Sequence, residues 1–126
     1  MKITRFKDLQ FIPASHEDPK NPGALKKILL KREDLPEGRV QMLNWSRIPK
    51  GKTFKPHYHE SMIEVFIIMN GKVRAKIGND ETILEKGDMA IAMEKEIHSF
   101  ENLSNEDADY FAMGIATAEG GKSINV

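Results

Sequence analysis

Two histidines one residue apart, followed by a glutamate, are the residues whose types and spacing could do chemistry in this chain. His57, His59 and Glu64 lie in the stretch GKTFKPHYHESMIEVFIIMNG. Successive side chains of a strand point to opposite faces, so His57 and His59 share a face. Glu64 follows His59 by an odd step and would face away on an unbroken strand. For Glu64 to join the histidines, the chain must bend or bulge between Glu60 and Ile63.

The residues after Glu64 are apolar on both faces of the expected strand. Phe66 and Ile68 continue the face of Glu64, and the opposite face carries Val65, Ile67 and Met69. A strand with two apolar faces is covered on both sides. Buried imidazoles and a buried carboxylate are costly unless they are paired or bound to a metal. A bound metal would satisfy all of these buried groups, so we interpret them as metal ligands.

A further candidate ligand lies downstream in EIHSFEN, where His98, Phe100 and Asn102 share a face. His98 is on a different strand, and a tertiary fold could bring it beside the first group. Three imidazoles and one carboxylate suit Fe(II), Mn(II), Ni(II), Co(II) or Zn(II) and leave open positions on an octahedral ion. One glutamate neutralises only part of a divalent charge, so we expect an anionic or chelating small-molecule ligand. We expect the pocket to be lined by Phe66, Ile68, Phe100 and Asn102.

The sequence predicts that short strands position these residues. From Val40 onwards, apolar runs alternate with turn signals at intervals of roughly ten residues, which is typical of an all-β sandwich or barrel. We expect strands at residues 40–48, 62–69, 72–78, 81–85, 89–93, 97–102 and 109–117. Asn70-Gly71 predicts a hairpin turn in which both residues have positive φ. The stretch ALKKILLK is compatible with a short helix, but we interpret it as a strand.

The chain divides into three parts in this interpretation. Residues 1–38 form an irregular extension that packs on the barrel or on a partner. Residues 39–117 form the barrel, and residues 118–126 form a flexible tail. His16, in a proline-rich loop, is interpreted as an exposed polar residue. Trp45 is interpreted as part of the core or of an interface.

The first histidine-containing stretch resembles the first motif of the cupin superfamily. That motif is usually written G-x5-H-x-H-x(3,4)-E-x6-G. Gly51, His57, His59, Glu64 and Gly71 fit it at every spacing.

The second cupin motif, G-x5-P-x-G-x2-H-x3-N, is matched in part. Gly87, His98 and Asn102 fall at the matching positions. Met93 stands where the family usually has proline, and Lys95 where it usually has glycine. We therefore expect the loop before His98 to be shaped differently, because lysine has a steric cost at positive φ that glycine does not.

The resemblance implies a fold and a range of functions. It implies a double-stranded β-helix, or jelly-roll barrel, and the metal ligands His57, His59, Glu64 and His98. It also implies small-molecule chemistry such as dioxygenation, isomerisation or decarboxylation, so an oxidoreductase or an isomerase is expected if the protein is an enzyme. A non-catalytic binding or sensing module and a storage protein stay open, because one fold hosts many functions. Small cupins often form homodimers, and we expect one here.

Composition excludes several other classes of function. The chain has 126 residues, the size of one domain, with 19 Lys+Arg and 19 Asp+Glu and a formal net charge of zero. A basic footprint for nucleic acid is therefore absent. No apolar run approaches the roughly 20 residues that cross a bilayer. Cysteine is absent, which excludes disulfides, Cys-ligated metals and a Cys–Tyr thiol dioxygenase centre. We expect a cytoplasmic protein.

Overall fold

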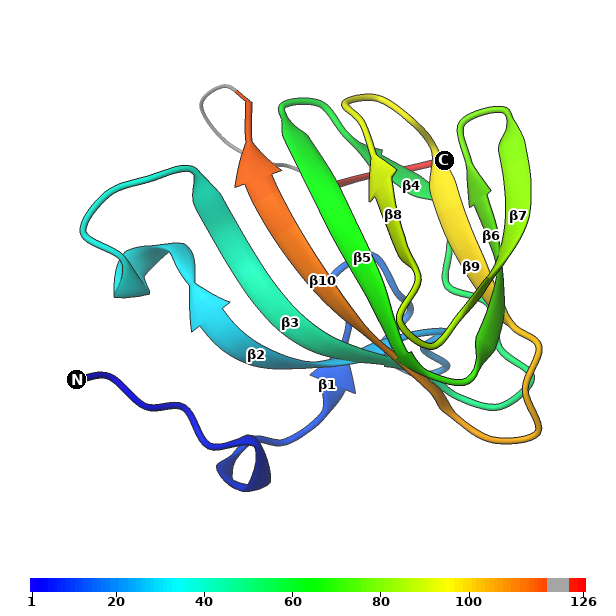
Figure 1. Cartoon of the computed structure of the whole chain (residues 1–126), viewed down its shortest axis with the longest axis horizontal. Coiled ribbons are helices and arrows are strands. Elements are labelled where there is room, and N and C mark those ends of the chain that lie inside the picture. Colours follow the sequence, from blue (N-terminus) through cyan, green and yellow to red (C-terminus); the bar gives the residue numbers. More distant parts are fainter. Residues whose placement is uncertain (118–122) are drawn as a thin grey trace.

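The computed structural model describes residues 1–117 and 123–126 of the chain, and they form two antiparallel β-sheets (Figure 1). The larger sheet has six strands in the order β1 (Ile12–Pro13), β2 (Leu25–Lys31), β3 (Val40–Ile48), β10 (Ala108–Ala116), β5 (Met62–Asn70) and β8 (Met89–Ala92). The smaller sheet has five, in the order β11 (Ser123–Asn125), β4 (His57–His59), β9 (His98–Asn102), β6 (Lys72–Ile77) and β7 (Asp80–Glu85). Two short 3-10 turns, η1 (Phe6–Asp8) and η2 (Arg32–Asp34), complete the described elements. The expectation of an all-β jelly-roll barrel is confirmed.

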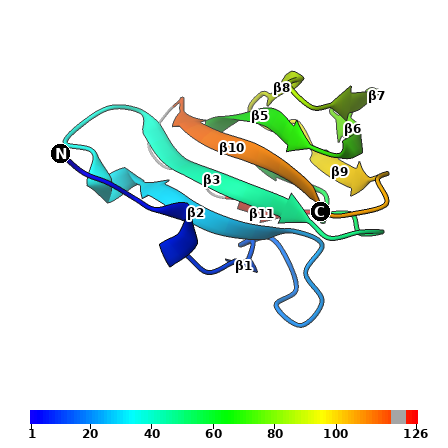
Figure 2. The same cartoon turned by 60° about the horizontal axis from the view of Figure 1, so that its bottom comes forward.

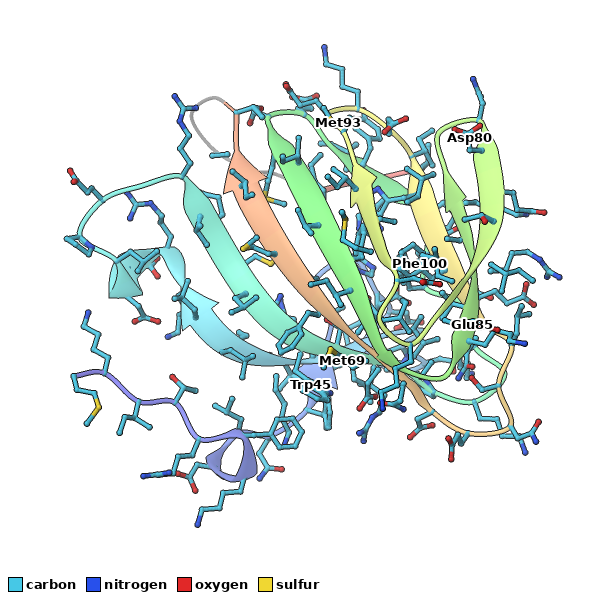
Figure 3. The ribbon with its side chains drawn as sticks, viewed as in Figure 1. Trp45, Met69, Asp80, Glu85, Met93 and Phe100 are labelled. Carbon is cyan, nitrogen blue, oxygen red and sulfur yellow. The ribbon has the colours of Figure 1, made fainter. Side chains whose placement is uncertain are left out.

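The core lies between the inner faces of the two sheets, and alternation along β5 shows how its side chains reach it. On β5, Glu64, Phe66 and Ile68 are buried, whereas the intervening Ile67 is exposed. Phe66 meets Phe100 of β9 with ring centroids 4.8 Å apart, and Figure 3 shows where Phe100 lies. Full burial of one such side chain stabilises the fold by roughly 1.5–3 kcal/mol. The expectation that both faces of β5 are covered is met on the inner face only, because Ile67 on the outer face is exposed in this chain.

The Asn70-Gly71 turn joins the two sheets and is not a hairpin, so that prediction was wrong. β5 belongs to the larger sheet and β6 to the smaller one. Gly71 has φ of 89°, but Asn70 is not among the described residues with positive φ. A Cβ on Gly71 would lie 2.8 Å from the Cβ of Ala108, so glycine also permits a close approach of two chain segments. The strands part at this corner because each one packs its inner face on the shared core.

The N-terminal region folds back on its own barrel. β2 pairs with β3 in the same chain, which confirms the interpretation of ALKKILLK as a strand. Phe6 packs edge-on against Trp45 on the outer face of β3, with ring centroids 5.1 Å apart. The Lys27 ammonium lies 3.6 Å from the centre of the Phe6 ring. Figure 2 shows β1 and the preceding turn beneath β2, so this region covers the outer face at the β2–β3 end of the sheet.

The C-terminal residues differ in part from the predicted flexible tail. Residues 118–122 lie outside the described residues. Beyond them, β11 pairs with β4, and Ile124 stands opposite Tyr58. A three-residue strand carries too little pattern to be recognised in the sequence. In the described part of the chain, no helix is long and apolar enough to cross a membrane.

Candidate metal centre

Three imidazoles and one carboxylate come together where the two sheets face each other. One ligand atom from each lies within 4.8 Å of the other three, and all four side chains are buried: His57, His59, Glu64 and His98. The two histidines of β4 and the first residue of β9 come from the smaller sheet, and Glu64 comes from β5 in the larger sheet. The bend expected before Glu64 is confirmed, because the chain crosses from β4 to β5 over residues 60 and 61.

Backbone carbonyls orient two of the imidazoles. His57 Nδ1 lies 2.8 Å from the Lys55 carbonyl oxygen, and His98 Nδ1 lies 3.0 Å from the Glu96 carbonyl oxygen. Donation from Nδ1–H to a carbonyl fixes the tautomer and leaves the Nε2 lone pair free to bind a metal. This is the arrangement that metal-ligating histidines commonly have.

The His98 ring supplies a direct test of whether a cation fits. Its Nε2 atom is buried, lacks a hydrogen bond among the described residues, and lies 3.4 Å from Glu64 Oε1. Buried polar atoms are normally satisfied, and an orphaned one calls for an explanation. An ion bound by this nitrogen and by the carboxylate would satisfy both, so the donor set fits a divalent transition metal.

The protonation of the group also suits a cation. Burial alone would raise the pKa of Glu64, but the hydrogen bond from His59 Nε2 to Oε1, at 2.8 Å, and the nearby His98 lower it to about 2. Burial, reinforced by the neighbouring His16 and His98, lowers the pKa of His57 to about 3. At neutral pH the site therefore holds a carboxylate and a neutral His57 imidazole, the forms that bind metals.

The loop before His98 keeps a left-handed backbone at the position where the cupin motif has glycine. Lys95 has φ of 63° and is the one non-glycine residue with positive φ in the described part of the chain. Its amide donates to the His59 carbonyl oxygen at 2.8 Å. Lysine thus adopts the conformation that glycine adopts more readily, and the expectation of a differently shaped loop is not met at this residue.

A cavity of about 400 Å³ opens beside the group. His57, His59 and Glu64 lie on its wall. The other walls come from the N-terminal loop, β2, η2, β3 and β10, and many of their side chains are polar or charged, among them His16, Lys26, Asn44, Ser46 and Tyr110. The sequence interpretation anticipated apolar walls and did not identify these residues, because it had no means of placing β2 beside β3.

The side chains expected to line the pocket lie elsewhere. Phe66, Ile68 and Phe100 are fully buried in the core, and Phe66 packs against His98 with ring centroids 5.5 Å apart. Asn102 donates from Nδ2 to the carbonyl oxygens of Ile48 and Glu106, at 3.0 and 2.7 Å. None of these four residues is part of the described cavity wall.

His16 is not the exposed residue that the sequence suggested. Its side chain is 12% exposed, and its ring stacks on His57 with centroids 3.8 Å apart. Its Nδ1 pairs with the buried carboxylate of Glu17, which also accepts from the amides of Gly23 and Lys55, each at 2.7 Å. Glu17 thereby fixes the N-terminal loop to the segment that leads into β4. The adjacent residues His16 and Glu17 are the sequence signal that could have indicated a role in the site, but no local pattern places them near His57.

Comparisons with known proteins show the family and the fold of the chain. A family model described as a cupin domain matches residues 44–114. A search of curated protein sequences found no match. Among solved structures, a predicted oxalate decarboxylase from Thermotoga maritima is similar, with a TM-score of 0.80 and 22% identity over 91% of this chain and 99% of that one.

Two further solved structures share the fold. The polyketide cyclase RemF from Streptomyces resistomycificus has a TM-score of 0.77 and 16% identity over 100% of this chain and 85% of that one. KdgF from Halomonas sp. has a TM-score of 0.75 and 15% identity over 94% and 96% of the two chains. At these identities the likeness concerns the fold alone.

Proposed function

The chain belongs to the cupin family, and from that premise we propose that it is a metal-dependent enzyme acting on a small anionic or chelating molecule. The proposed ion is one divalent transition metal per chain, namely Fe, Mn, Ni, Co or Zn. The proposed ligands are the three imidazoles and the carboxylate of the buried group: His57, His59, Glu64 and His98. The supporting observation is that their ligand atoms converge within 4.8 Å and that His57, His59 and Glu64 lie on the wall of a cavity.

The residues of the chain have separable roles in this proposal. The carbonyls of Lys55 and Glu96 orient two imidazoles, and Glu64 offsets part of the charge of the ion. Stacking of His16 restricts the His57 ring. A bound ion of this kind supplies a Lewis acid that polarises an oxygen atom of the substrate. Dioxygenation, isomerisation and decarboxylation are the reaction classes that we propose to test.

The alternative is a cupin that binds or senses a metal and a small ligand without turnover. A closed, saturated site would favour a purely structural metal. The cavity instead reaches the ligand group and carries Lys26, Asn44 and Tyr110 on its wall, which favours a role in binding and converting a substrate. A cytoplasmic location stays a prediction.

Metal analysis of protein purified without a histidine tag tests the proposal. We expect about one divalent transition metal per chain, and we expect His59→Ala to lose most of it because the loss of a ligand weakens a site severely. Glu94→Ala is the control, because it removes an exposed carboxylate that is not a proposed ligand. Full metal occupancy in His59→Ala would argue against the assignment.

A turnover screen then separates the enzyme from the binding module. Metal-loaded protein is incubated with a panel of small carboxylic acids, and oxygen consumption, carbon dioxide release and isomer formation are followed. Turnover that His59→Ala abolishes supports the enzyme. Ligand binding without turnover across the panel would favour the alternative.

We also propose that the protein is a homodimer that pairs through the outer face of β5 and β8. Ile67 stands opposite Met89, and Val65 opposite Ile91; the N-terminal region leaves Ile67, Met89 and Ile91 exposed. A stable interface of this kind buries on the order of 2,000 Å². We expect light scattering to give twice the chain mass of 14.3 kDa and Ile91→Glu to give the single mass. A single mass for the unmodified protein would refute the dimer.

A further inference from the structure

The cavity wall carries a charged group and an unsatisfied polar group besides the proposed metal ligands. The charged group is Lys26 on β2, and the unsatisfied one is Asn44 on β3. Both point inward, because their strands alternate: the neighbouring Lys27 packs on Phe6 and Trp45 contacts Phe111, both on the outer face.

Lys26 stands at the end of a polar row that crosses three strands. It pairs in register with Ser46, which pairs with Tyr110, and these last two side chains hydrogen-bond to each other. Lys26 Nζ donates to Ser15 Oγ at 2.9 Å and therefore has donor capacity left. Lys26 lines the same cavity as His57, His59 and Glu64. Burial lowers the pKa of Lys26, and the negative charge of Glu64 acts in the opposite sense.

The charge balance of the cavity favours an anion. Three cationic side chains lie on its wall, Lys26, Lys31 and Arg32, against two carboxylates, Glu33 and Glu64. A divalent ion bound by the imidazoles would make the cavity more positive still. A ligand that bears negative charge at both ends would be attracted both to the ion and to Lys26.

Asn44 supplies an independent observation. Its side chain is buried, with 7% of the residue exposed, and it lies on the cavity wall. Its Oδ1 atom has no hydrogen-bond partner among the described residues, and its Nδ2 atom reaches only the sulfur of Met42, at 3.4 Å. A buried amide oxygen without a donor is unfavourable. A hydroxyl group of a ligand would satisfy it.

We propose that Lys26 and Asn44 form a subsite for a small hydroxy-dicarboxylate. Lys26 pairs with the carboxylate at the far end of the ligand, Asn44 Oδ1 accepts from its hydroxyl group, and the near carboxylate reaches the metal. The proposal rests on the proposed function, because the near end needs the metal. The cavity volume of about 400 Å³ is in the range of small-molecule sites.

Calorimetric titration of the zinc-loaded protein with three matched probes tests the subsite. Malate carries all three recognition groups. 2-Hydroxybutanoate lacks the far carboxylate, and succinate lacks the hydroxyl group. We expect malate to bind about tenfold more tightly than either of the others, the effect of losing one hydrogen bond to a charged or buried group.

Variants assign each effect to a residue. Lys26→Met should weaken malate binding about tenfold and leave 2-hydroxybutanoate binding unchanged. Asn44→Leu should reduce malate binding to the level of succinate. Lys27→Met is the matched control, since it removes an ammonium on the opposite face of the same strand. Should Lys26→Met fold poorly, as judged by its melting curve, Lys26→Gln replaces it.

The outcomes separate the two proposals. If zinc is bound and malate, 2-hydroxybutanoate and succinate bind equally or not at all, the subsite is overturned and the metal centre stands. An equal loss of malate affinity in Lys27→Met would also overturn it. If zinc does not bind, the titration is repeated with Fe(II), Mn(II), Ni(II) and Co(II), and if none of the five metals binds, both the proposed function and the subsite fail.

Discussion

Removing the charge of Glu17 should destabilise the protein and loosen the N-terminal wall of the cavity. The Glu17 carboxylate accepts from the amides of Gly23 and Lys55, each at 2.7 Å, and pairs with His16 Nδ1. Its side chain is 2% exposed. In Glu17→Gln, the amide oxygen keeps one acceptor role, but the amide NH₂ group then faces the remaining N–H donors.

The expected loss in free energy of unfolding follows from these contacts. A hydrogen bond to a charged group contributes about 1.5–3 kcal/mol, and a buried donor left unsatisfied costs about 1–3 kcal/mol. We therefore expect Glu17→Gln to lower the free energy of unfolding by about 3 kcal/mol. For a domain of this length, that is a fall in Tm of roughly 10 °C.

The pH dependence gives a second signature of the same group. Burial acts to raise the pKa of Glu17, but the bonds from His16, Lys55 and Gly23 outweigh it and lower the pKa below its ordinary 4.5. A carboxyl group with a lowered folded-state pKa stabilises fully above its unfolded-state pKa, and this contribution is lost as pH falls through the folded-state value. Below pH 4.5 the unmodified protein should therefore lose stability more steeply than Glu17→Gln.

Denaturant unfolding followed by circular dichroism, between pH 7 and pH 3, is the measurement. Glu94→Gln, at an exposed carboxylate, is the control and should change the free energy of unfolding by less than about 0.5 kcal/mol. If Glu17→Gln unfolds with the same free energy as the control at pH 7, the carboxylate does not hold the N-terminal loop as the contacts indicate.

Three further outcomes are expected. Metal at 100 times its dissociation constant stabilises the folded protein by about 2.7 kcal/mol. Removing it with a chelator should therefore lower Tm by roughly 10 °C. A melting scan without a shift would contradict metal binding. Lys95→Gly should change the free energy of unfolding by less than about 1 kcal/mol. Glycine relieves the left-handed strain of roughly 1–2 kcal/mol, but it loses more backbone entropy on folding, and the two effects partly cancel. A loss of several kcal/mol in denaturant unfolding would contradict this. Gly23→Ala should destabilise by about 3 kcal/mol, because its Cβ would lie 2.0 Å from the Thr53 carbonyl oxygen; an unchanged Tm would contradict the close approach.

The sequence determined the strands and the polar group of the proposed metal centre. Alternation is a local property, so the inward direction of His57 and His59 and the break before Glu64 followed from spacing alone. The expected strands from Val40 onwards agree closely with β3 and β5–β10 for the same reason. The place of His98 came from the motif resemblance, and the structure brings it opposite His57 in register.

Only the tertiary structure decided what surrounds that group. Whether Phe66 or Lys26 borders the cavity depends on which strands pair and how the sheets close, and those contacts join residues far apart in the chain. The turn at Asn70-Gly71 carries a local hairpin signal, yet the packing of β5 and β6 on a common core places them in different sheets. His16 and Glu17 reach the site because β1 and β2 extend the larger sheet and bring their connecting loop over β4. A short polar loop has no periodicity of its own, so its destination is set by the pairing of the strands that flank it.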